Sequence, residues 1–352
     1  MEATPVATVV PETRKLAYIV RVTGLKPLEW ADKIAVAQVE GWEVVVQKGQ
    51  FEVGDMAVYF EIDSVLPNEG HTAFLEGKRL KTKMFRDQIS QGLLGPLSWL
   101  GGSIDSFKEG DDVTVDMKVQ KWVHPNEMSS YEYDGGDVKV GWISELIPKT
   151  DEVRVQSAPK QLAFLKDRKV VVTQKYDGTS ATFVVIGGKF SVCGRNRVHT
   201  SKDNSNAHFY EIVSRYNLEE KMLALNRNIA LQGEIIGPKI NGNRHSVKTV
   251  EFHAFNLFDI NDGVYSDWDD VVQVTTALGL KTVPVVYRGV MQDSLLSVPA
   301  LLALADQQQY TNGEIPRICE GVVVKSDYAY ADKQPRASFK VISNKYLKKY
   351  DL

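Results

Sequence analysis

Residues 170–186 read VVVTQKYDGTSATFVVI, and this stretch decides how the chain is interpreted. Two runs of branched and aromatic residues, 170–173 and 181–186, have the composition of β-strands. Asp177-Gly178 between them predicts a tight turn, so the simplest local structure is a β-hairpin. A hairpin by itself needs no catalytic explanation for Lys175. The functional interpretation of this lysine therefore depends on the residues that accompany it along the chain.

Two carboxylates stand inside apolar, strand-like runs downstream of the lysine. Glu234 lies within IALQGEIIG, residues 229–237, and Glu320 opens EGVVVK, residues 320–325. A buried carboxylate is unfavourable unless it is paired or holds a cation. Each could instead face solvent at a strand end. Two such sites after Lys175 favour a place for Mg²⁺ or Mn²⁺, since hard cations prefer oxygen ligands and retain several waters.

Aromatic residues crowd the segment FHAFNLFDI, residues 252–260. Simple alternation along a strand places Phe255 on one face with His253 and Leu257, and Phe252 with Phe258 on the other. Core packing explains most aromatics in strands. Stacking on an adenine ring would explain one of them.

Two lysines near the end of the chain also lie in apolar runs. Lys325 closes EGVVVK, and Lys340 lies within ASFKVI, residues 337–342. Either amine could neutralise a phosphate whose geometry changes during group transfer. The alternative for each is a surface lysine whose stem covers apolar neighbours.

In this order the motifs resemble those of the covalent nucleotidyltransferase superfamily of ligases and capping enzymes. More closely, the chain resembles ATP-dependent RNA ligases of the nick-sealing type, RNA ligase family 5. The resemblance covers nearly the whole chain, including IPKTDEVRVQ at 147–156 and CGRN at 193–196. Two positions depart from the family pattern: Ser338 stands where relatives often have lysine, and Ser180 where some have asparagine.

The resemblance implies the following roles. Lys175 is the catalytic lysine that becomes adenylated, and Arg195 engages substrate phosphate. The residues implied to bind the nucleotide are Arg154, Gln174, Lys175, Glu234, Phe255, Glu320, Lys325 and Lys340. The residues implied to hold metal, mainly through water, are Asp177, Glu234 and Glu320, with a second metal site near Asn68 and Glu69.

This chemistry requires an amine, because nitrogen attacking the α-phosphorus of ATP leaves a phosphoramidate that can hold AMP and pass it on. A free lysine has a pKa of about 10.4 and is protonated near neutrality. A nearby metal ion or cation, with partial desolvation, would favour the neutral amine.

The length of 352 residues predicts two domains. Short strand-like segments separated by glycine-containing turns fill residues 14–120 and predict an OB-like β-barrel. We expect an α+β fold overall: a flexible tail at 1–13, the OB-fold domain, a connector at 121–150, and a ligase-type adenylyltransferase domain at 151–352 with antiparallel sheets and flanking helices. The resemblance implies that the OB domain helps to bind the pyrophosphate of ATP or a nucleic-acid duplex.

Composition excludes several other classes. No apolar run reaches the eighteen or so residues of a membrane helix, and the first residues have no basic start, so we do not expect a secretory signal. Two cysteines argue against a disulfide framework and fit an intracellular, cytoplasmic and reducing compartment. Although the net charge is −3, KRLKTKMFR at 78–86 and KYLKK at 345–349 supply local basic patches, each of which could equally be a solvated face.

The sequence thus predicts a monomeric ATP-dependent RNA ligase that uses Mg²⁺ or Mn²⁺. It would seal 3′-hydroxyl and 5′-phosphate ends of RNA or an RNA-containing duplex through lysyl-AMP and an adenylated 5′ end. A DNA ligase or a capping guanylyltransferase would share the lysine chemistry. The domain order speaks against both, since those enzymes usually place the OB domain last. A non-enzymatic OB-fold nucleic-acid-binding protein is the third possibility, and it would have no use for Lys175.

Overall fold

The computed structural model describes residues 14–101, 106–123, 133–134, 137–138, 146–199, 202–311, 316–327, 337–350 and 352. The expected tail at 1–13 lies outside the described residues, as does most of the expected connector at 121–150. The chain divides into two compact units, of which unit 1 ends at Trp122 and unit 2 runs from Val123 to Tyr350.

Unit 1 consists mainly of antiparallel strands. One sheet has the order β1-β5-β9 and another the order β2-β3-β4. The strand bounds are β1 Ala17–Arg21, β2 Gly24–Pro27, β3 Ile34–Val39, β4 Trp42–Gln47, β5 Met56–Phe60 and β9 Leu93–Pro96. The described residues of unit 1 also form two short strand pairs and two 3-10 helices: β6 Ser64–Val65 with β10 Gln120–Lys121, β7 Lys83–Phe85 with β8 Gln88–Ser90, η1 Gly70–Leu75 and η2 Leu97–Leu100.

The two main sheets of unit 1 are linked where the Gln91 amide donates to the Glu43 carbonyl at 2.7 Å. Two apolar clusters form its interior, one around Trp42 and Tyr59 and one around Phe60. The antiparallel, OB-like arrangement is as predicted. Within residues 14–101 and 106–123 the strand pairings are distributed over separate sheets.

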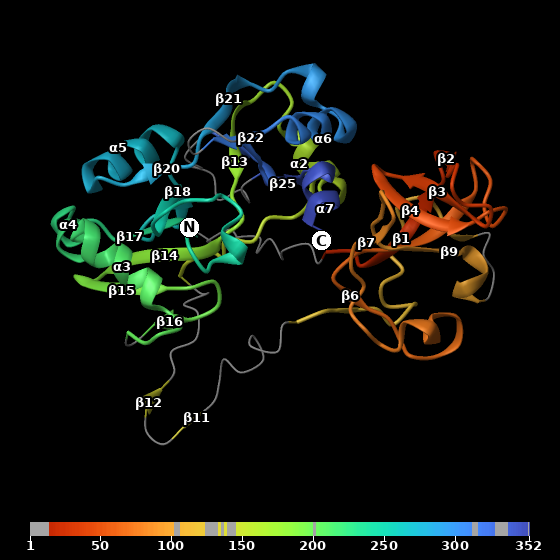
Figure 1. The fold of residues 1–352 in the computed structure, drawn as a ribbon, viewed down its shortest axis with the longest axis horizontal. Helices are drawn as coiled ribbons and strands as arrows, with labels where there is room; N and C mark the ends of the chain where they lie inside the picture. The colour runs from red at the N-terminus through yellow and green to blue at the C-terminus, as the bar shows by residue number, and fades with distance from the viewer. Residues whose placement is uncertain are drawn as a thin grey trace, which may run out of the picture. The chain divides into compact units, whose positions relative to one another are not determined.

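Unit 2 contains two larger sheets (Figure 1). The four-stranded sheet has the order β21-β13-β24-β25, with β13 Lys169–Lys175, β21 Val285–Val290, β24 Gly321–Ser326 and β25 Ser338–Ile342. The seven-stranded sheet runs β16-β15-β14-β17-β18-β19, and β20 pairs with β18. Its strands are β14 Thr179–Ile186, β15 Lys189–Cys193, β16 Val198–His199, β17 Ile229–Ile236, β18 Glu251–Asp259, β19 Val264–Tyr265 and β20 Lys281–Thr282. Two short pairs remain: β11 Tyr133–Asp134 with β12 Asp137–Val138, and β22 Gln309–Thr311 with β23 Pro316–Ile318.

Helices cover both sheets of unit 2 (Figure 1). The seven-stranded sheet buries its apolar face against α3 Ala207–Tyr216, α4 Leu218–Ala224 and α5 Trp268–Leu278. The four-stranded sheet packs against α2 Pro159–Phe164 and α6 Val298–Asp306. The remaining helices are η4 Val155–Ser157, η5 Asn241–Asn243, η6 Asp293–Leu295 and the C-terminal α7 Asn344–Tyr350.

The two strands around Lys175 form as predicted, but they do not form a hairpin. Strand β13 pairs with β21 and β24, whereas β14 pairs with β15 and β17. The turn at Asp177-Gly178 therefore carries the chain from one sheet to the other. Local residue preferences identify strands and turns, but strand partners are chosen by packing between distant segments, so the hairpin prediction was wrong.

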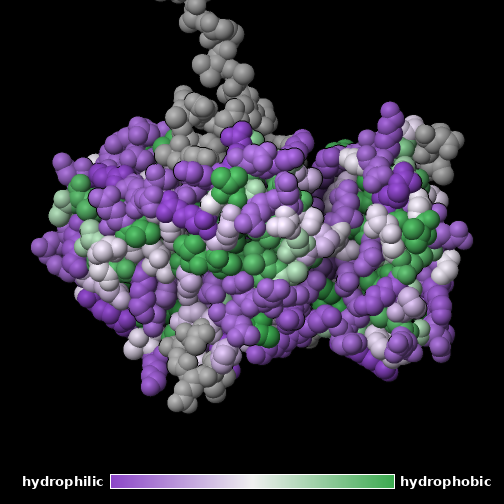
Figure 2. All heavy atoms as spheres, turned by 90° about the horizontal axis from the view of Figure 1, so that it is seen from above, coloured by the Kyte–Doolittle hydropathy of each residue, from purple (hydrophilic) through white to green (hydrophobic). Residues whose placement is uncertain are grey.

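Figure 2 shows polar side chains over most of one face of the described residues, with apolar side chains in smaller groups between them. Across the described residues, none of the helices combines the length and apolar character needed to cross a bilayer.

Candidate active site

The crossing between the sheets places Lys175 at the edge of a cavity of about 410 Å³. Lys175 is the last residue of β13 and lies opposite Gly321 on β24. The cavity is lined by residues of both sheets and of the segment that precedes α2, namely Thr150, Asp151, Glu152, Thr173, Gln174, Lys175, Tyr176, Asp177, Gly178, Thr179, Ser180, Arg195, Glu234, Asn241, Phe255, Asn256, Val283, Glu320, Val323, Lys325 and Lys340. Most of the site residues predicted from sequence are therefore brought together.

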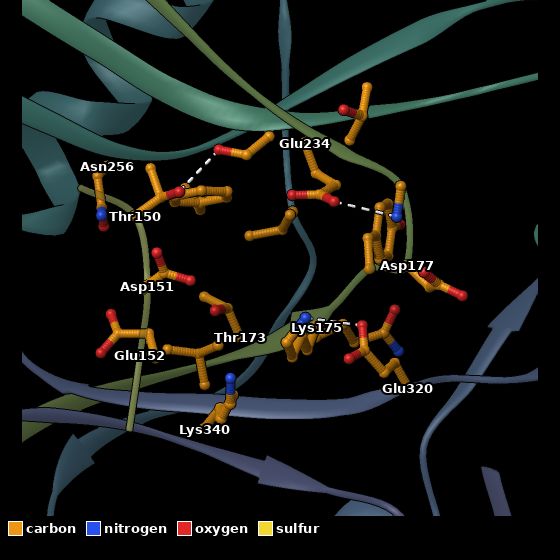
Figure 3. Close-up of a pocket in the computed structure, with 18 of the residues that line it drawn as sticks. Thr150, Asp151, Glu152, Thr173, Lys175, Asp177, Glu234, Asn256, Glu320 and Lys340 are labelled. Atoms are coloured by element: carbon orange, nitrogen blue, oxygen red, sulfur yellow. Dashed lines mark hydrogen bonds and ion pairs between the residues drawn. The ribbon is translucent and has the colours of Figure 1, made fainter. Parts of the chain in front are cut away.

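The Lys175 amine faces carboxylates. Its Nζ donates to Glu320 Oε2 at 2.7 Å, and both side chains are largely buried (Figure 3). Burial alone would lower the pKa of Lys175, but the negative charges of Glu320, Glu234 and Asp177 outweigh that effect and raise it. In this arrangement the ammonium form is favoured, and the amine needs an added positive charge nearby to become a nucleophile.

Glu234 comes from β17 and contacts the turn at Asp177-Gly178. Its Oε1 accepts a hydrogen bond from the Gly178 amide at 3.0 Å. Burial, offset in part by Lys175 and reinforced by Glu320, raises the pKa of Glu234 to about 8. Glycine is required at 178 by close approach, since a Cβ there would lie 2.2 Å from the Ile235 carbonyl oxygen.

Lys340 has the opposite environment to Lys175. It lies on β25, opposite Val323 of β24, and its amide donates to the Val153 carbonyl at 2.8 Å. Burial, together with the positive charges of Lys175 and Arg154, lowers the pKa of Lys340 to about 8. Arg154 forms a parallel bridge with Lys340 and acts on it electrostatically, although it is not among the residues that line the cavity.

Phe255 reaches the cavity because of a β-bulge. The register of β17 and β18 pairs Gln232 with Asn256 and Gly233 with Ala254, so Phe255 is the extra residue. Phe255 and Asn256 both line the cavity as a result. The predicted alternation is wrong beyond this point, because a bulge reverses the faces of all residues that follow it. Phe252 shares a core cluster with Leu257, and Phe258 belongs to another.

Lys325 is held at the floor of the cavity. Its amine donates to the Phe255 carbonyl and to Asn256 Oδ1, the latter at 3.0 Å. Asn256 in turn donates to Gln232 Oε1 at 3.1 Å, and Lys325 Nζ lies 4.8 Å from the centroid of the Trp268 ring. This buried network fixes both the lysine and the bulged strand.

Two predicted residues lie nearer the rim. Arg195 Nη2 pairs with Asp151 Oδ1 at 2.7 Å, and its side chain is 58% exposed. Gln174 donates to the Gln309 carbonyl at 3.0 Å and lines the cavity. An exposed guanidinium of this kind is available to exchange its carboxylate partner for a phosphate.

Asp177 is directed away from the Lys175 amine (Figure 3). Its Oδ1 accepts from Asn241 Nδ2 at 2.7 Å, and its Oδ2 accepts from Arg244 and from the Tyr346 hydroxyl. Sequence reasoning missed these three partners. Asn241 and Arg244 stand in a glycine- and asparagine-rich segment that reads as an ordinary loop, and Tyr346 was noted only as part of a basic patch.

The cavity offers oxygen donors of the kind that a divalent cation requires. Glu234 and Glu320 offer carboxylates to the same cavity. The raised pKa of Glu234 means that burial disfavours its anionic form, which a bound cation would stabilise. Among the described residues, no group of three or more His, Cys, Asp or Glu side chains gathers closely enough to coordinate one ion directly. The site fits a hard cation with few direct protein ligands and several waters.

Comparisons with known proteins place this geometry in a family. An RNA ligase family model matches residues 168–342, and an OB-fold domain model matches residues 16–97. Naegleria gruberi RNA ligase, solved as a lysine-to-methionine mutant with AMP and Mn, has a TM-score of 0.75 and 32% identity. That match covers 96% of this chain and 99% of the other. This chain belongs to the RNA ligase family.

Two further structures of the Naegleria gruberi enzyme agree with this assignment. A mutant with ATP and Mn has a TM-score of 0.74 and 32% identity, covering 96% of this chain and 100% of that one. The enzyme with PPi has a TM-score of 0.73 and 33% identity, covering 96% and 99%. A comparison with curated proteins gave no match. The predicted resemblance to RNA ligases with an OB-fold domain is confirmed, and the RNA ligase match lies outside the OB segment, which speaks against a purely OB-type binding protein.

The predicted second metal site lies in unit 1 of this RNA ligase. Glu69 immediately precedes η1, and its carboxylate pairs with Lys118 Nζ at 3.1 Å with both side chains exposed. Asn68 is its neighbour in the chain. The role of these two residues stays a prediction.

Proposed function

We propose that this RNA ligase uses ATP to join a 3′-hydroxyl to a 5′-phosphate, with Lys175 as the residue that carries AMP. The observation that supports this proposal most is the environment of Lys175. Its amine opens into a cavity that also holds two carboxylates, an aromatic ring from a bulged strand and two further lysines. That combination suits a nucleotide with its base on Phe255 and its phosphates near Lys325 and Lys340.

The proposed reaction has three displacements at phosphorus. Lys175 Nζ forms a bond to the α-phosphorus of ATP and loses a proton, while the bond to the β-phosphate oxygen breaks and pyrophosphate leaves. An oxygen of the RNA 5′-phosphate then attacks the same phosphorus, and the lysine amine leaves. Finally the 3′-hydroxyl attacks the 5′-phosphorus, loses its proton and displaces AMP.

The side chains of the cavity divide the remaining work. Lys325 and Lys340 place positive charge where the α-phosphate gains negative charge. Arg154 adds a further positive charge close to Lys340. Arg195, exposed and paired only at the rim, binds the phosphate of the RNA end. Gln174 holds the nucleophile strand beside the nucleotide.

Glu234 and Glu320 would hold a divalent cation, mainly through water, and Asn68 and Glu69 a second one. The Asp177 carboxylate, which accepts from Asn241, Arg244 and the Tyr346 hydroxyl, would not hold the first cation in this arrangement. When bound, the first cation would supply positive charge beside Lys175 that favours its neutral amine. The Naegleria gruberi structures with ATP and Mn and with AMP and Mn support the assignment of ATP and a divalent metal to this chain.

The test is incubation with α-³²P-labelled ATP and Mn²⁺ or Mg²⁺, followed by a denaturing gel. We expect a labelled protein band that is acid-labile, alkali-resistant and absent in Lys175→Ala. Label from GTP but not ATP would replace the proposal with capping chemistry. Label from neither nucleotide would leave the OB-fold binding protein as the better account.

The nucleic-acid substrate needs its own experiment. Nicked duplexes with RNA or DNA on the 3′-hydroxyl side and on the 5′-phosphate side, in all four combinations, separate the possibilities. We expect the all-RNA nick to be sealed faster than the all-DNA nick, because the family is that of RNA ligases. Equal sealing of an all-DNA nick would contradict the RNA assignment. Analytical ultracentrifugation with and without duplex tests the expectation of a monomer.

A further inference from the structure

The turn that follows Lys175 is held by an unusually complete set of hydrogen bonds. The Asp177 amide donates to His245 Nε2 at 3.1 Å, and its carboxylate accepts from Asn241, Arg244 and Tyr346. Asn241 Nδ2 also donates to the Gly178 carbonyl at 2.7 Å. All but one of these contacts come from the segment between β17 and β18. The exception, Tyr346, comes from helix α7 at the end of the chain.

Arg244 links these two elements. Its guanidinium pairs with Asp177, and its Nη1 donates to the Tyr346 hydroxyl at 2.9 Å. The same guanidinium lies 5.6 Å from the centroid of the Tyr346 ring and 4.6 Å from that of Tyr350. Only 24% of the Arg244 side chain is exposed, and Tyr346 is 2% exposed. Charge-assisted contacts in such a poorly solvated place are stronger than at a surface.

Ser343, which immediately precedes α7, contacts Glu320. The Ser343 amide donates to the Glu320 carbonyl at 2.9 Å. Ser343 Oγ accepts from the Tyr346 amide at 3.1 Å and donates to Asp306 Oδ1 at 2.7 Å. Helix α7 and the residue before it therefore contact both Asp177, two residues after Lys175, and the backbone of Glu320, whose carboxylate pairs with Lys175.

We propose that Arg244 and Tyr346 are positioning residues for the adenylation of Lys175, and that through them the C-terminal helix α7 completes the active site. This inference rests on the proposed function. Neither side chain needs to touch ATP. By fixing the Asp177 carboxylate they fix the turn, and so the direction from which the Lys175 amine approaches the α-phosphorus.

The alternative is a structural ion pair that stabilises the fold and nothing more. The two roles differ in what they change. A positioning role alters the rate at saturating ATP, because the approach of nitrogen to phosphorus tolerates little displacement. A purely structural role lowers the melting temperature and leaves the chemical step of the folded protein as it was.

Tyr346→Phe is the most discriminating variant, because it removes one hydroxyl and keeps the buried ring. Tyr287→Phe is the matched control: its hydroxyl also donates one hydrogen bond, to the Val290 carbonyl at 2.6 Å, and it does not line the cavity. Single-turnover labelling with α-³²P-ATP should slow roughly 10- to 100-fold in Tyr346→Phe, as for loss of a hydrogen bond to a charged group. The KM for ATP should change by less than about threefold, and Tyr287→Phe should label at the wild-type rate.

Arg244→Lys and Arg244→Gln supply the second measurement. Arg244→Lys keeps a positive charge beside Asp177 but lacks the several N–H donors of the planar guanidinium. Its labelling rate should therefore lie between those of wild type and Arg244→Gln. Thermal melting of every variant separates unfolding from a slowed step, and labelling is measured well below the lowest midpoint. Wild-type rates in folded Tyr346→Phe, or a change in the KM for ATP alone, would overturn the inference while the proposed function stands. Absence of label in the wild-type enzyme would overturn both.

Discussion

The two sides of the cavity beside Lys175 shift the pKa of a lysine amine in opposite directions. On the carboxylate side, Lys175 faces Glu320 and Glu234, and its pKa is raised although burial acts to lower it. On the cationic side, Lys340 faces Lys175 and Arg154, and burial and these charges lower its pKa to about 8. Judged by pKa alone, Lys340 would be the better nucleophile near neutrality.

The comparison shows that position and not intrinsic basicity selects the nucleophile in the proposed mechanism. Lys175 ends a strand and opens the turn between two sheets, so its amine extends into the cavity beside the carboxylates (Figure 3). Lys340 lies within β25, bridged to Arg154. The carboxylates that raise the pKa of Lys175 are also the groups that would hold a cation in the proposed mechanism, so we expect the activation of Lys175 to depend on metal.

The largest expected effect comes from replacing each of the two lysines by alanine and comparing the effects on covalent labelling. Lys175→Ala should abolish covalent labelling by α-³²P-ATP, because no other amine is placed at the end of β13. Lys340→Ala should slow labelling by roughly 100-fold or more through loss of phosphate stabilisation, yet still give a band on long exposure. Peptide mapping of the labelled band identifies the modified lysine. Label on Lys340, or a band that survives in Lys175→Ala, would break the comparison.

Removing one carboxylate should have a smaller effect. Glu320→Gln keeps the shape and loses the charge that pairs with Lys175, so labelling at saturating ATP should fall roughly 10- to 100-fold, as for ligands and supports of metal sites. Glu251→Gln is a matched control. Its side chain has the same 18% exposure and also pairs with a lysine, Lys281 at 2.9 Å, but it does not line the cavity. Equal losses in the two variants would contradict the assignment of Glu320 to the site.

The pattern of short motifs predicted the family, and most of the site residues that it named line the cavity, because each motif places chemistry at a strand end where local sequence is informative. What it could not predict depends on distant pairing. The β13–β14 turn joins two sheets because β13 pairs with residues about 150 positions later in the chain. The bulge at Phe255 depends on the register with β17. Arg244 and Tyr346 meet Asp177 across 67 and 169 positions, and no local pattern marks them.

Helix boundaries show the same limit at a smaller scale. The apolar residues of segment 207–225 are spaced as on one face of a helix, but the structure divides this segment into α3 and α4 at Asn217, which has a φ of 50°. Asparagine adopts this left-handed conformation more readily than most residues. The composition of the segment therefore permits the break, whereas packing against the seven-stranded sheet decides it.

The pH dependence of labelling sharpens the comparison further. Only the neutral amine of Lys175 attacks, so the rate should rise with pH and level off above the pKa of Lys175. The Glu320 carboxylate stabilises the ammonium, and its removal lowers that pKa. In Glu320→Gln the inflection should therefore move to lower pH while the plateau rate falls. An unchanged inflection would show that the carboxylate does not control the protonation of Lys175.

The smallest effect is on stability and concerns Lys340 in the absence of nucleotide. Its pKa falls from an ordinary 10.5 to about 8 in the folded protein, so between these values the unfolded chain binds more protons. The contribution of Lys340 to stability therefore rises with pH across that window, and at pH 7 the buried ammonium is destabilising. Lys340→Met should raise the free energy of unfolding at pH 7 by about 1–2 kcal/mol, a value reduced for its partial exposure.

Urea denaturation at pH 7 and pH 10 measures this effect. The increase in the free energy of unfolding caused by Lys340→Met should be smaller at pH 10. At that pH the wild-type lysine is neutral in the folded state, so the folded protein no longer contains a buried ammonium. The same variant should label more slowly with ATP, since the cation that destabilises the free protein is the one that the triphosphate needs. If Lys340→Met is less stable than wild type at pH 7, the Lys340 ammonium makes a favourable interaction in the folded protein. The pKa values of Lys175 and Lys340 would then differ less than their surrounding charges indicate.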